Sequence, residues 1–208
     1  MLPPDFPGYQ GYCPYTTGAG DGAWHGPDME KARQLVGESG TTNMPVTVWS
    51  FNAKPGKAAG SYLVGLLDDL GYRATLHAVS PDQFYPGNAP NTNIQVSIGG
   101  GWAADFPAPS TFFGPTLSCQ SVDEPGTQNS ARFCDPQVDA LVSQAQAAQL
   151  TDPAAARRLW ALVDRIVTDQ APYVPVFNTG GVGFGSSRAG NYQESPAYGP
   201  LVDQMWIR

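Results

Sequence analysis

The sequence is poor in the features that would place it in a membrane or on nucleic acid. No apolar run approaches the length of roughly 18 residues that a spanning helix needs, so no segment is expected to cross a bilayer. Lys and Arg number 11 against 18 Asp and Glu, a net charge of −7 without runs of either sign. This balance gives no electrostatic basis for binding nucleic acid or an anionic membrane surface. The opening MLPPDFPGYQ lacks the basic and apolar regions of a signal peptide.

Residues that carry catalysis or bind metals are scarce as well. His25 and His77 have no Cys, Asp or Glu set nearby at ligand spacing, so we interpret both as structural. The motifs G-x-S-x-G, H-E-x-x-H and G-K-[ST] are absent from the sequence. Residues 180–185 are rich in glycine, but no Lys and no helical pattern follow, which favours a turn over a phosphate site. The sequence therefore gives no argument for an enzyme, a metal site or a cofactor.

Cysteine is rare and odd in number. Cys13, Cys119 and Cys134 match neither a zinc-ligand spacing nor a CxxC redox motif. Cys119 and Cys134 lie 15 positions apart in a polar, loop-like stretch. One bridge with one cysteine left over is therefore possible.

Glycine and proline are abundant, at 24 and 20 of 208 residues. Hydrophobic residues still make up 41% and aromatic residues 11%, which excludes a disordered chain. A chain of this length is expected to form one domain, or one with an appendage, and to bury roughly 70% of the surface exposed when unfolded. We expect a globular domain with many long, turn-rich connections.

The first half of the chain alternates strand and helix patterns. Asp28 is placed to cap a helix, and later leucines at helical spacing predict a second one. β-branched and aromatic runs or strict alternation predict the strands. In order, the expected segments are a helix at about 29–36, a strand at 45–51, a helix at 57–70, a strand at 72–79, a short helix from Ser80-Pro81-Asp82 and a strand at 94–98.

The second half begins with residues 102–135, which show no clear period and are expected to form a long connection. Asp135-Pro136 and Asp152-Pro153 each predict the start of a helix. Strands are expected at 173–177 and 202–207. This order of strands and helices indicates an α/β domain.

One stretch of this connection, which follows the strand at 94–98, is a candidate ligand site. The strand runs into Gly99-Gly100-Gly101, and Trp102 and Asp105 come next. Ligands of α/β sheets bind beyond the carboxyl ends of strands, and glycines allow close approach to the backbone. Trp102 can pack against an apolar or planar group, and Asp105 can bind a cation or an ammonium group. The alternative, which the local pattern alone favours, is a structural Trp and a turn-forming Asp before a proline-rich loop.

Five segments, taken in order, carry a resemblance to a known family. They are residues 28–36, similar to "D-x-x-K-A-x-x-L-L"; 45–72, similar to a strand–helix–"GI/GV" unit; 101–109, similar to "GW-x-x-D-x-x-D/E-P"; 129–141, similar to "N-x-x-x-Y-x-N-P-x-x-D-x-L"; and 151–175, similar to "D-x-x-x-R-x-x-x-Y-x-x-x-x-x-I-x-x-x-x-P-x-x-P". Together they resemble the C-terminal lobe of the dipeptide/oligopeptide-binding proteins of bacterial ABC importers, extracellular solute-binding family 5. Each motif is loose, but their order and spacing are specific, and they cover nearly the whole chain.

The resemblance implies a fold and a division of the chain. The fold would be α/β, one lobe of a periplasmic-binding-protein type II fold with a mixed sheet flanked by helices. Residues 1–26 would be an irregular lead-in from the N-terminal lobe, 27–178 the C-terminal solute-binding lobe and 179–208 the return strands. We expect the chain to be part of a longer protein, because an isolated lobe would expose half of a cleft to water.

The resemblance also implies roles for individual residues. Asp105 would anchor the ammonium group of a ligand, and Trp102 would line the pocket. The further ligand-binding candidates are Gly100, Gly101, Phe106 and Trp49. No metal and no cofactor is implied.

Cys119 and Cys134 match a disulfide-bearing loop of the dipeptide-binding members, which leaves Cys13 without a counterpart. The sequence departs from the family pattern at Ala108, which replaces an acidic residue before Pro109. It departs again at residues 133–136, where FCDP replaces "Y-x-N-P". These departures bear on the identity of the ligand more than on the fold.

The implied function is the solute-binding component of an ABC importer, which would bind peptides or a related ammonium-bearing molecule between two lobes. Its partners would be this ligand and the permease subunits, and it would act outside the cytoplasm. The alternative is the ligand-sensing lobe of a fused signalling or transcriptional regulator, which would be cytoplasmic. An enzyme is disfavoured because no catalytic constellation is present.

Overall fold

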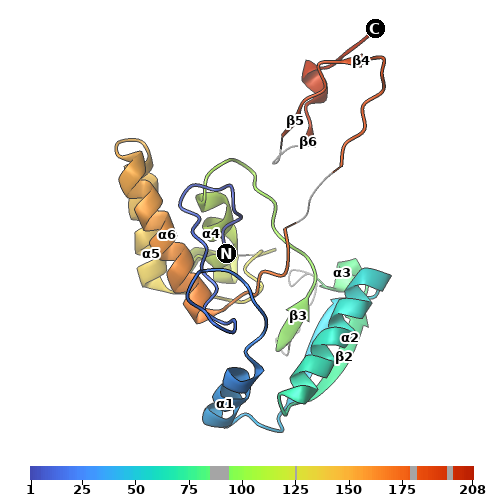
Figure 1. The fold of residues 1–208 in the computed structure, drawn as a ribbon, viewed down its shortest axis with the longest axis vertical. Helices are drawn as coiled ribbons and strands as arrows, with labels where there is room; N and C mark the ends of the chain where they lie inside the picture. The colour runs from blue at the N-terminus through green and yellow to red at the C-terminus, as the bar shows by residue number, and fades with distance from the viewer. Residues whose placement is uncertain (85–93, 125, 179–181, 196–198) are drawn as a thin grey trace. The chain divides into compact units, whose positions relative to one another are not determined.

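The computed structural model describes residues 1–84, 94–124, 126–178, 182–195 and 199–208 (Figure 1). The elements in chain order are α1 Met29–Ser39, β1 Pro45–Phe51, α2 Lys54–Asp69, β2 Arg73–Val79, α3 Pro81–Phe84, β3 Val96–Ile98, α4 Ser110–Leu117, η1 Gln120–Asp123, α5 Pro136–Gln149, α6 Pro153–Gln170, β4 Ala189–Gly190, β5 Glu194–Ser195, β6 Gly199–Pro200, η2 Val202–Gln204 and β7 Trp206–Ile207.

The chain forms two compact units, and each is described by itself. The sheet unit consists of Gln10–Gly101 and Pro115–Cys134. The helix unit consists of Met1–Tyr9, Trp102–Gly114 and Asp135–Arg208. Each unit is therefore built from segments that are distant in sequence.

The sheet unit is built on a parallel three-stranded sheet in the order β2-β1-β3. In the register of this sheet, Val48 of the central strand pairs with Leu76 and with Val96. Val48 and Ser50, which alternation places on one face, are fully buried. Helix α2 packs on this face so closely that a Cβ at Gly60 would lie 2.6 Å from a methyl group of Leu76. The carboxyl ends of the three strands meet at one edge of the sheet.

The helix unit is built on α5 and α6, which contact each other and are joined by a short loop (Figure 1). Each helix begins at a proline, and the Asp before it accepts hydrogen bonds from backbone N–H groups of the first turn, Asp135 from Gln137 and Asp152 from Ala154 and Ala155. The buried face of α6 has helical spacing and consists of Ala156, Trp160, Val163, Asp164 and Val167.

The N-terminal segment completes the core of the helix unit. Leu2 is buried, and its backbone N–H donates to Asp164 Oδ1 at 2.8 Å. The rings of Phe6 and Phe112 meet edge to face with 5.0 Å between their centres. Residues 1–9 are thus an integral part of this unit.

Most of the expected elements are confirmed, with boundaries shifted by a few residues. The first helix extends to Ser39, and α2 begins at Lys54, three residues before the expected start. The strands β1, β2 and β3 and the helices from Pro136 and Pro153 are present. The 102–135 stretch, expected to lack regular structure, contains α4 and η1. Gly114 and Pro115, both unfavourable inside helices, hid α4 from the pattern.

The two strands expected near the C-terminus are not found as predicted. The strand expected at 173–177 is wrong, because residues 173–178 form no helix or strand. Val174 and Phe177 are both 78% exposed, and a β-branched run becomes a strand only where a partner strand is available. The strand expected at 202–207 is replaced by η2 and the two-residue β7. Of the glycine-rich turn at 180–185, residues 180 and 181 lie outside the described residues, and 182–185 form no helix or strand.

Candidate functional site

The glycine run lies directly beyond the carboxyl end of β3. Gly99 and Gly100 have φ values of +135° and +75°, which other residues rarely adopt. A Cβ at Gly99 would also lie 2.9 Å from the ring of Phe51. Gly101 differs, because its φ lies outside this range and no atom lies within 4 Å of a Cβ built on it. Backbone conformation therefore explains the first two glycines, whereas nothing in the fold requires the third.

Asp105 lies in the turn before α4 and is exposed. Its backbone N–H donates to Thr111 Oγ1 at 2.9 Å, and the Thr111 hydroxyl donates to Asp105 Oδ2 at 3.3 Å. Thr111 itself is only 1% exposed, so this contact braces the turn against the first residues of the helix. The structural role that the sequence allowed for Asp105 is thus present. Its carboxylate nevertheless lies at the surface, where it can attract a cation.

The two aromatic residues of this segment differ in burial. Phe106 is 45% exposed, whereas Trp102 is partly buried. The indole Nε1–H of Trp102 is inaccessible to solvent and has no hydrogen-bond partner among the residues that the structure describes. Sequence reasoning identified Trp102 as an apolar wall and missed this donor, because burial of a single atom depends on tertiary packing.

Trp49 lies on β1, on the face of the sheet opposite to Val48 and Ser50. Its ring meets that of His77 at the paired position of β2, with 4.4 Å between centres. The expected ligand-binding residues therefore fall into two groups, one in each unit. Trp102, Asp105 and Phe106 share one segment of the helix unit, and Trp49, Gly100 and Gly101 belong to the sheet unit.

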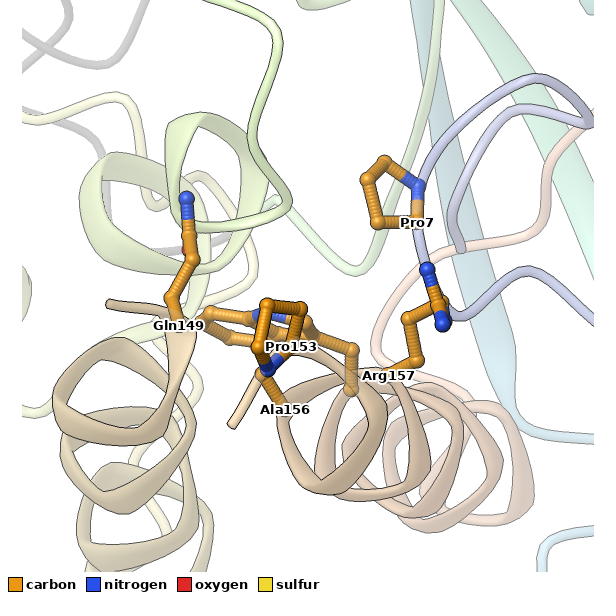
Figure 2. A pocket seen from close by; sticks show the side chains of 6 residues that line it. Pro7, Gln149, Pro153, Ala156 and Arg157 are labelled. Atoms are coloured by element: carbon orange, nitrogen blue, oxygen red, sulfur yellow. The ribbon is translucent and has the colours of Figure 1, made fainter. Parts of the chain in front are cut away.

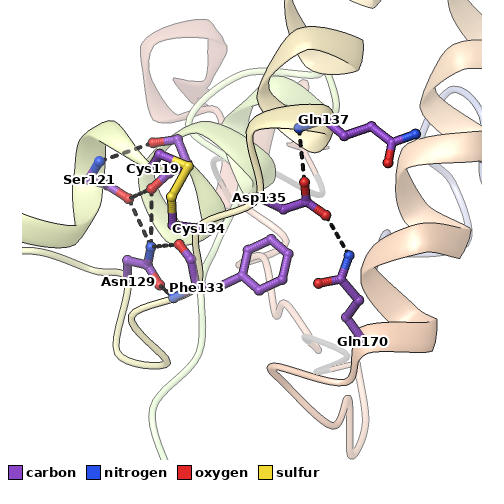
Figure 3. The surroundings of a disulfide bond; sticks show 9 residues. Cys119, Ser121, Asn129, Phe133, Cys134, Asp135, Gln137 and Gln170 are labelled. Carbon is purple, nitrogen blue, oxygen red and sulfur yellow. Dashed lines mark hydrogen bonds between the residues drawn. A yellow bond between two sulfur atoms is a disulfide. The ribbon is translucent and has the colours of Figure 1, made fainter.

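The expected disulfide between Cys119 and Cys134 is present, and Cys13 is free (Figure 3). Asn129, which has no exposed surface, lies beside the bridge and ties the same loop together. Its amide group donates to the carbonyls of Ser118 and Phe133 and to Ser121 Oγ, and its carbonyl accepts from the Phe133 N–H. The sequence showed Asn129 only as one position of a motif. In the structure its side chain makes the hydrogen bonds that hold the loop together.

Asp135 joins the two long helices of the helix unit (Figure 3). Gln170 Nε2 donates to Asp135 Oδ2 at 2.6 Å, and the backbone N–H of Gln137 donates to Oδ1 at 2.9 Å. These bonds, first that from Gln170, hold the pKa of the Asp135 carboxyl below its ordinary value. The start of α5 is thereby fastened to the last turn of α6.

A small cavity lies between the N-terminal segment and the start of α6 (Figure 2). Its volume is about 130 Å³, and it is lined by Pro7, Gln149, Pro153, Ala156, Arg157 and Trp160. Small-molecule sites usually offer about 300–1,000 Å³. None of the expected ligand-binding residues lines this cavity, so we do not assign the ligand to it.

The described part of the chain contains no cluster of three or more His, Cys, Asp or Glu residues that could hold a metal ion. Within the same residues, no helix combines the length and the apolar character needed to cross a membrane.

No protein-family model matches this chain, but two curated proteins that are named as binding proteins are similar to it. Di/tripeptide-binding protein 4 of Pseudomonas aeruginosa is 28% identical over 154 residues, which covers 72% of this chain and 28% of that protein. Heme-binding protein A of Haemophilus influenzae is 26% identical over 218 aligned positions, which covers 84% and 39%. The chain thus spans well under half the length of these relatives.

Solved structures of similar fold include binding proteins as well. Clavulanic acid biosynthesis oligopeptide binding protein 2 matches with a TM-score of 0.86 and 22% identity, over all of this chain and 38% of that one. A periplasmic binding protein from Helicobacter pylori, solved with the peptide STSA, matches with a TM-score of 0.65 and 20% identity, over 83% and 31%. These likenesses confirm the expected fold class, a lobe of a periplasmic-binding-protein fold.

Proposed function

We propose that this chain, a relative of the dipeptide- and oligopeptide-binding proteins of bacterial ABC importers, forms the C-terminal lobe of such a solute-binding protein. The observation that carries this proposal is the likeness to an oligopeptide-binding protein along the whole chain, together with the di/tripeptide-binding relative from Pseudomonas. The chain matches only part of each, as one lobe of a two-lobed protein would. We extend the proposal to its ligand, a peptide or another small molecule with an ammonium group.

We assign each candidate residue a role in ligand binding, beginning with those of the helix unit. Asp105 supplies the charge that pairs with the ammonium group, and Trp102 and Phe106 supply apolar surface beside it. Gly101 supports a close approach of the ligand, because its glycine has no other explanation in the fold. Trp49 and Gly100, which belong to the sheet unit, are the remaining candidates for ligand binding. Residues 1–26 would lead in from an N-terminal lobe, with residues 1–9 packed in the helix unit, 27–178 would form the C-terminal lobe, and 179–208 would return to the first lobe.

The proposed setting is outside the cytoplasm, where the protein would deliver its ligand to the permease subunits of an importer. The Cys119–Cys134 bridge fits an oxidising compartment, because disulfides are rare in the cytosol. The role is binding and delivery, not catalysis. The relatives give no support to the alternative of a cytoplasmic regulator.

Heme is a second candidate ligand, because one relative that covers most of this chain is named for binding it. A heme carries two propionates and no ammonium group, so Asp105 would oppose rather than attract it. The carboxylate in the candidate segment therefore favours a peptide over heme.

The experiment is a titration of the chain, followed by ¹H–¹⁵N NMR, with Ala-Ala and separately with hemin. One lobe offers one wall of a cleft, so Ala-Ala should bind weakly and perturb the resonances of residues 99–106 first. A titration with buffer alone, which contains no primary amine, serves as the blank. Perturbation by hemin alone would transfer the assignment to heme. Sub-micromolar affinity for Ala-Ala would overturn the half-site proposal, and no perturbation by either probe would overturn the proposed function.

A further inference from the structure

The small cavity at the start of α6 is a feature of the helix unit that the proposed function leaves unused. All six residues that line it belong to this unit (Figure 2). Ala156 and Trp160 are buried and form its floor, and four exposed residues form its opening: Pro7, Gln149, Pro153 and Arg157. An apolar cavity of roughly 150 Å³ can take up a molecule as large as benzene. The volume of about 130 Å³ therefore suits one aliphatic side chain.

Leu150 projects from the loop between α5 and α6, between two residues that line the cavity. It is 90% exposed, and of the large apolar side chains that the structure describes only Phe184 is more exposed. The loop is well fixed, because the backbone N–H groups of Thr151 and Asp152 both donate to the carbonyl of Ala148, at 3.1 and 2.7 Å. A side chain held out in this way can enter a partner without a large cost for ordering its loop.

Opposite charges flank the same opening. Asp152 Oδ1 accepts from the N–H groups of Ala154 and Ala155, which leaves Oδ2 without a partner in the part of the chain that the structure describes. The guanidinium of Arg157 is exposed and forms no ion pair with any residue described. Leu150, Asp152 and the residues that line the cavity together form the hairpin patch. This patch holds a projecting apolar side chain beside a cavity, and a carboxylate near a guanidinium.

A patch that holds both members of each complementary pair fits a second copy of itself. A two-fold axis brings each residue of a pair onto its complement in the other copy, twice over. We propose that two copies of this chain associate through the hairpin patch, with Leu150 of each in the cavity of the other and Asp152 of each against Arg157 of the other. This inference goes beyond the proposed function and does not depend on it.

The expected association is weak. Stable interfaces bury roughly 1,200–2,000 Å², and a contact built on one loop and one cavity per copy is smaller. We therefore expect a dissociation constant of about 0.1–1 mM, which sedimentation equilibrium and the concentration dependence of NMR shifts can both measure.

The test uses two variants of the patch, each with a matched control. Leu150→Ala removes the projecting side chain, and its control is Val174→Ala, an apolar residue of the same unit that is 78% exposed and outside the patch. Arg157→Glu reverses the charge at the opening, and its control is Arg158→Glu, which changes the net charge equally at a residue that does not line the cavity. All four residues are exposed, so the fold should be retained. Each patch variant should weaken dimerisation at least about tenfold, because its contact is lost twice per dimer, and each control should change it little.

A second readout locates the contact. In a mixture of ¹³C-labelled and unlabelled chains, isotope-filtered NOEs should connect the methyl groups of Leu150 in one copy with protons of Pro7 and Pro153 in the other. The same resonances should shift with concentration in the wild type and not in Leu150→Ala.

Three results would overturn the proposal. One is a wild-type chain that stays monomeric at about 1 mM. Another is association that persists undiminished in both patch variants, which would assign it to a different exposed surface. The third is a monomeric chain whose patch resonances shift with added 4-methylpentanoate and not in Arg157→Glu, which would assign the cavity to a small carboxylate. None of these results bears on the binding of Ala-Ala, so the proposed function is tested separately.

Discussion

Asp105 has a structural role and a proposed ligand-binding role, and two substitutions can separate them. Its contact with Thr111 braces the turn before α4, whereas its charge is the feature that a ligand would use. Asp105→Asn keeps an acceptor for the Thr111 hydroxyl and removes the charge. Thr111→Val keeps the charge and removes the brace.

We expect the two variants to behave in opposite ways. Asp105→Asn should leave the melting temperature nearly unchanged and weaken Ala-Ala binding. In a cleft closed from both sides the loss would be about 2–5 kcal/mol, and in the open lobe it would be smaller, because water screens the charge. Thr111→Val should lower the free energy of unfolding by about 1–3 kcal/mol, since it leaves the Asp105 N–H without its acceptor. Denaturant unfolding and NMR titration measure the two quantities; a large stability loss in Asp105→Asn with normal binding would assign the residue to the fold alone.

Among the elements, the loop between α4 and α5 is stabilised by the Cys119–Cys134 disulfide and by the hydrogen bonds of Asn129. The double variant Cys119→Ser/Cys134→Ser should lose about 3 kcal/mol of stability in the chain-entropy account of a loop of this size. Cys13→Ser, which removes the free cysteine, is the control and should change little. Denaturant unfolding without reductant gives both values. Equal stability of the double variant and the control would show that Asn129 and its hydrogen bonds hold the loop unaided.

The link between α5 and α6 should depend on pH. Because the pKa of Asp135 is held below its ordinary value of 3.8 in the folded chain, its contribution to stability is present above that value. It is lost as the pH falls through the folded-state pKa. Gln170→Ala removes the main cause, so wild type should melt higher than this variant above about pH 4, and the difference should shrink in acid. Gln137→Ala keeps the backbone donor and serves as control; a difference that persists unchanged in strong acid would contradict the assignment.

The elements that the sequence predicted are those that carry their own local signals. Asp28 caps α1 as expected, and Asp135-Pro136 and Asp152-Pro153 start α5 and α6 as expected, since capping residues and prolines act within a few residues. α4 was missed because its Gly and Pro oppose the helix, which tertiary packing stabilises through buried Phe113.

The candidate site was predictable only in part, for a similar reason. The position of Asp105 after a strand and a glycine run follows from sequence order alone. The brace to Thr111 and the buried indole nitrogen of Trp102 depend on how an irregular segment folds back on itself. No periodic pattern encodes such contacts.

For the whole chain, the proposed ligand-binding residues belong to both units, Trp102, Asp105 and Phe106 to the helix unit and Trp49, Gly100 and Gly101 to the sheet unit. Val174, Phe177 and Phe184 are 78%, 78% and 92% exposed. These large apolar side chains lie at residues 174–184, around the proposed boundary between the lobe and the return strands.

One comparison of two peptides can decide whether the ligand is held by its ammonium group. The affinities of the chain for Ala-Ala and for N-acetyl-Ala-Ala should be measured by NMR titration under identical conditions. Acetylation, which removes the positive charge and keeps the peptide backbone, should abolish measurable binding, just as Asp105→Asn should weaken it. Equal affinities for the two peptides would contradict the claim.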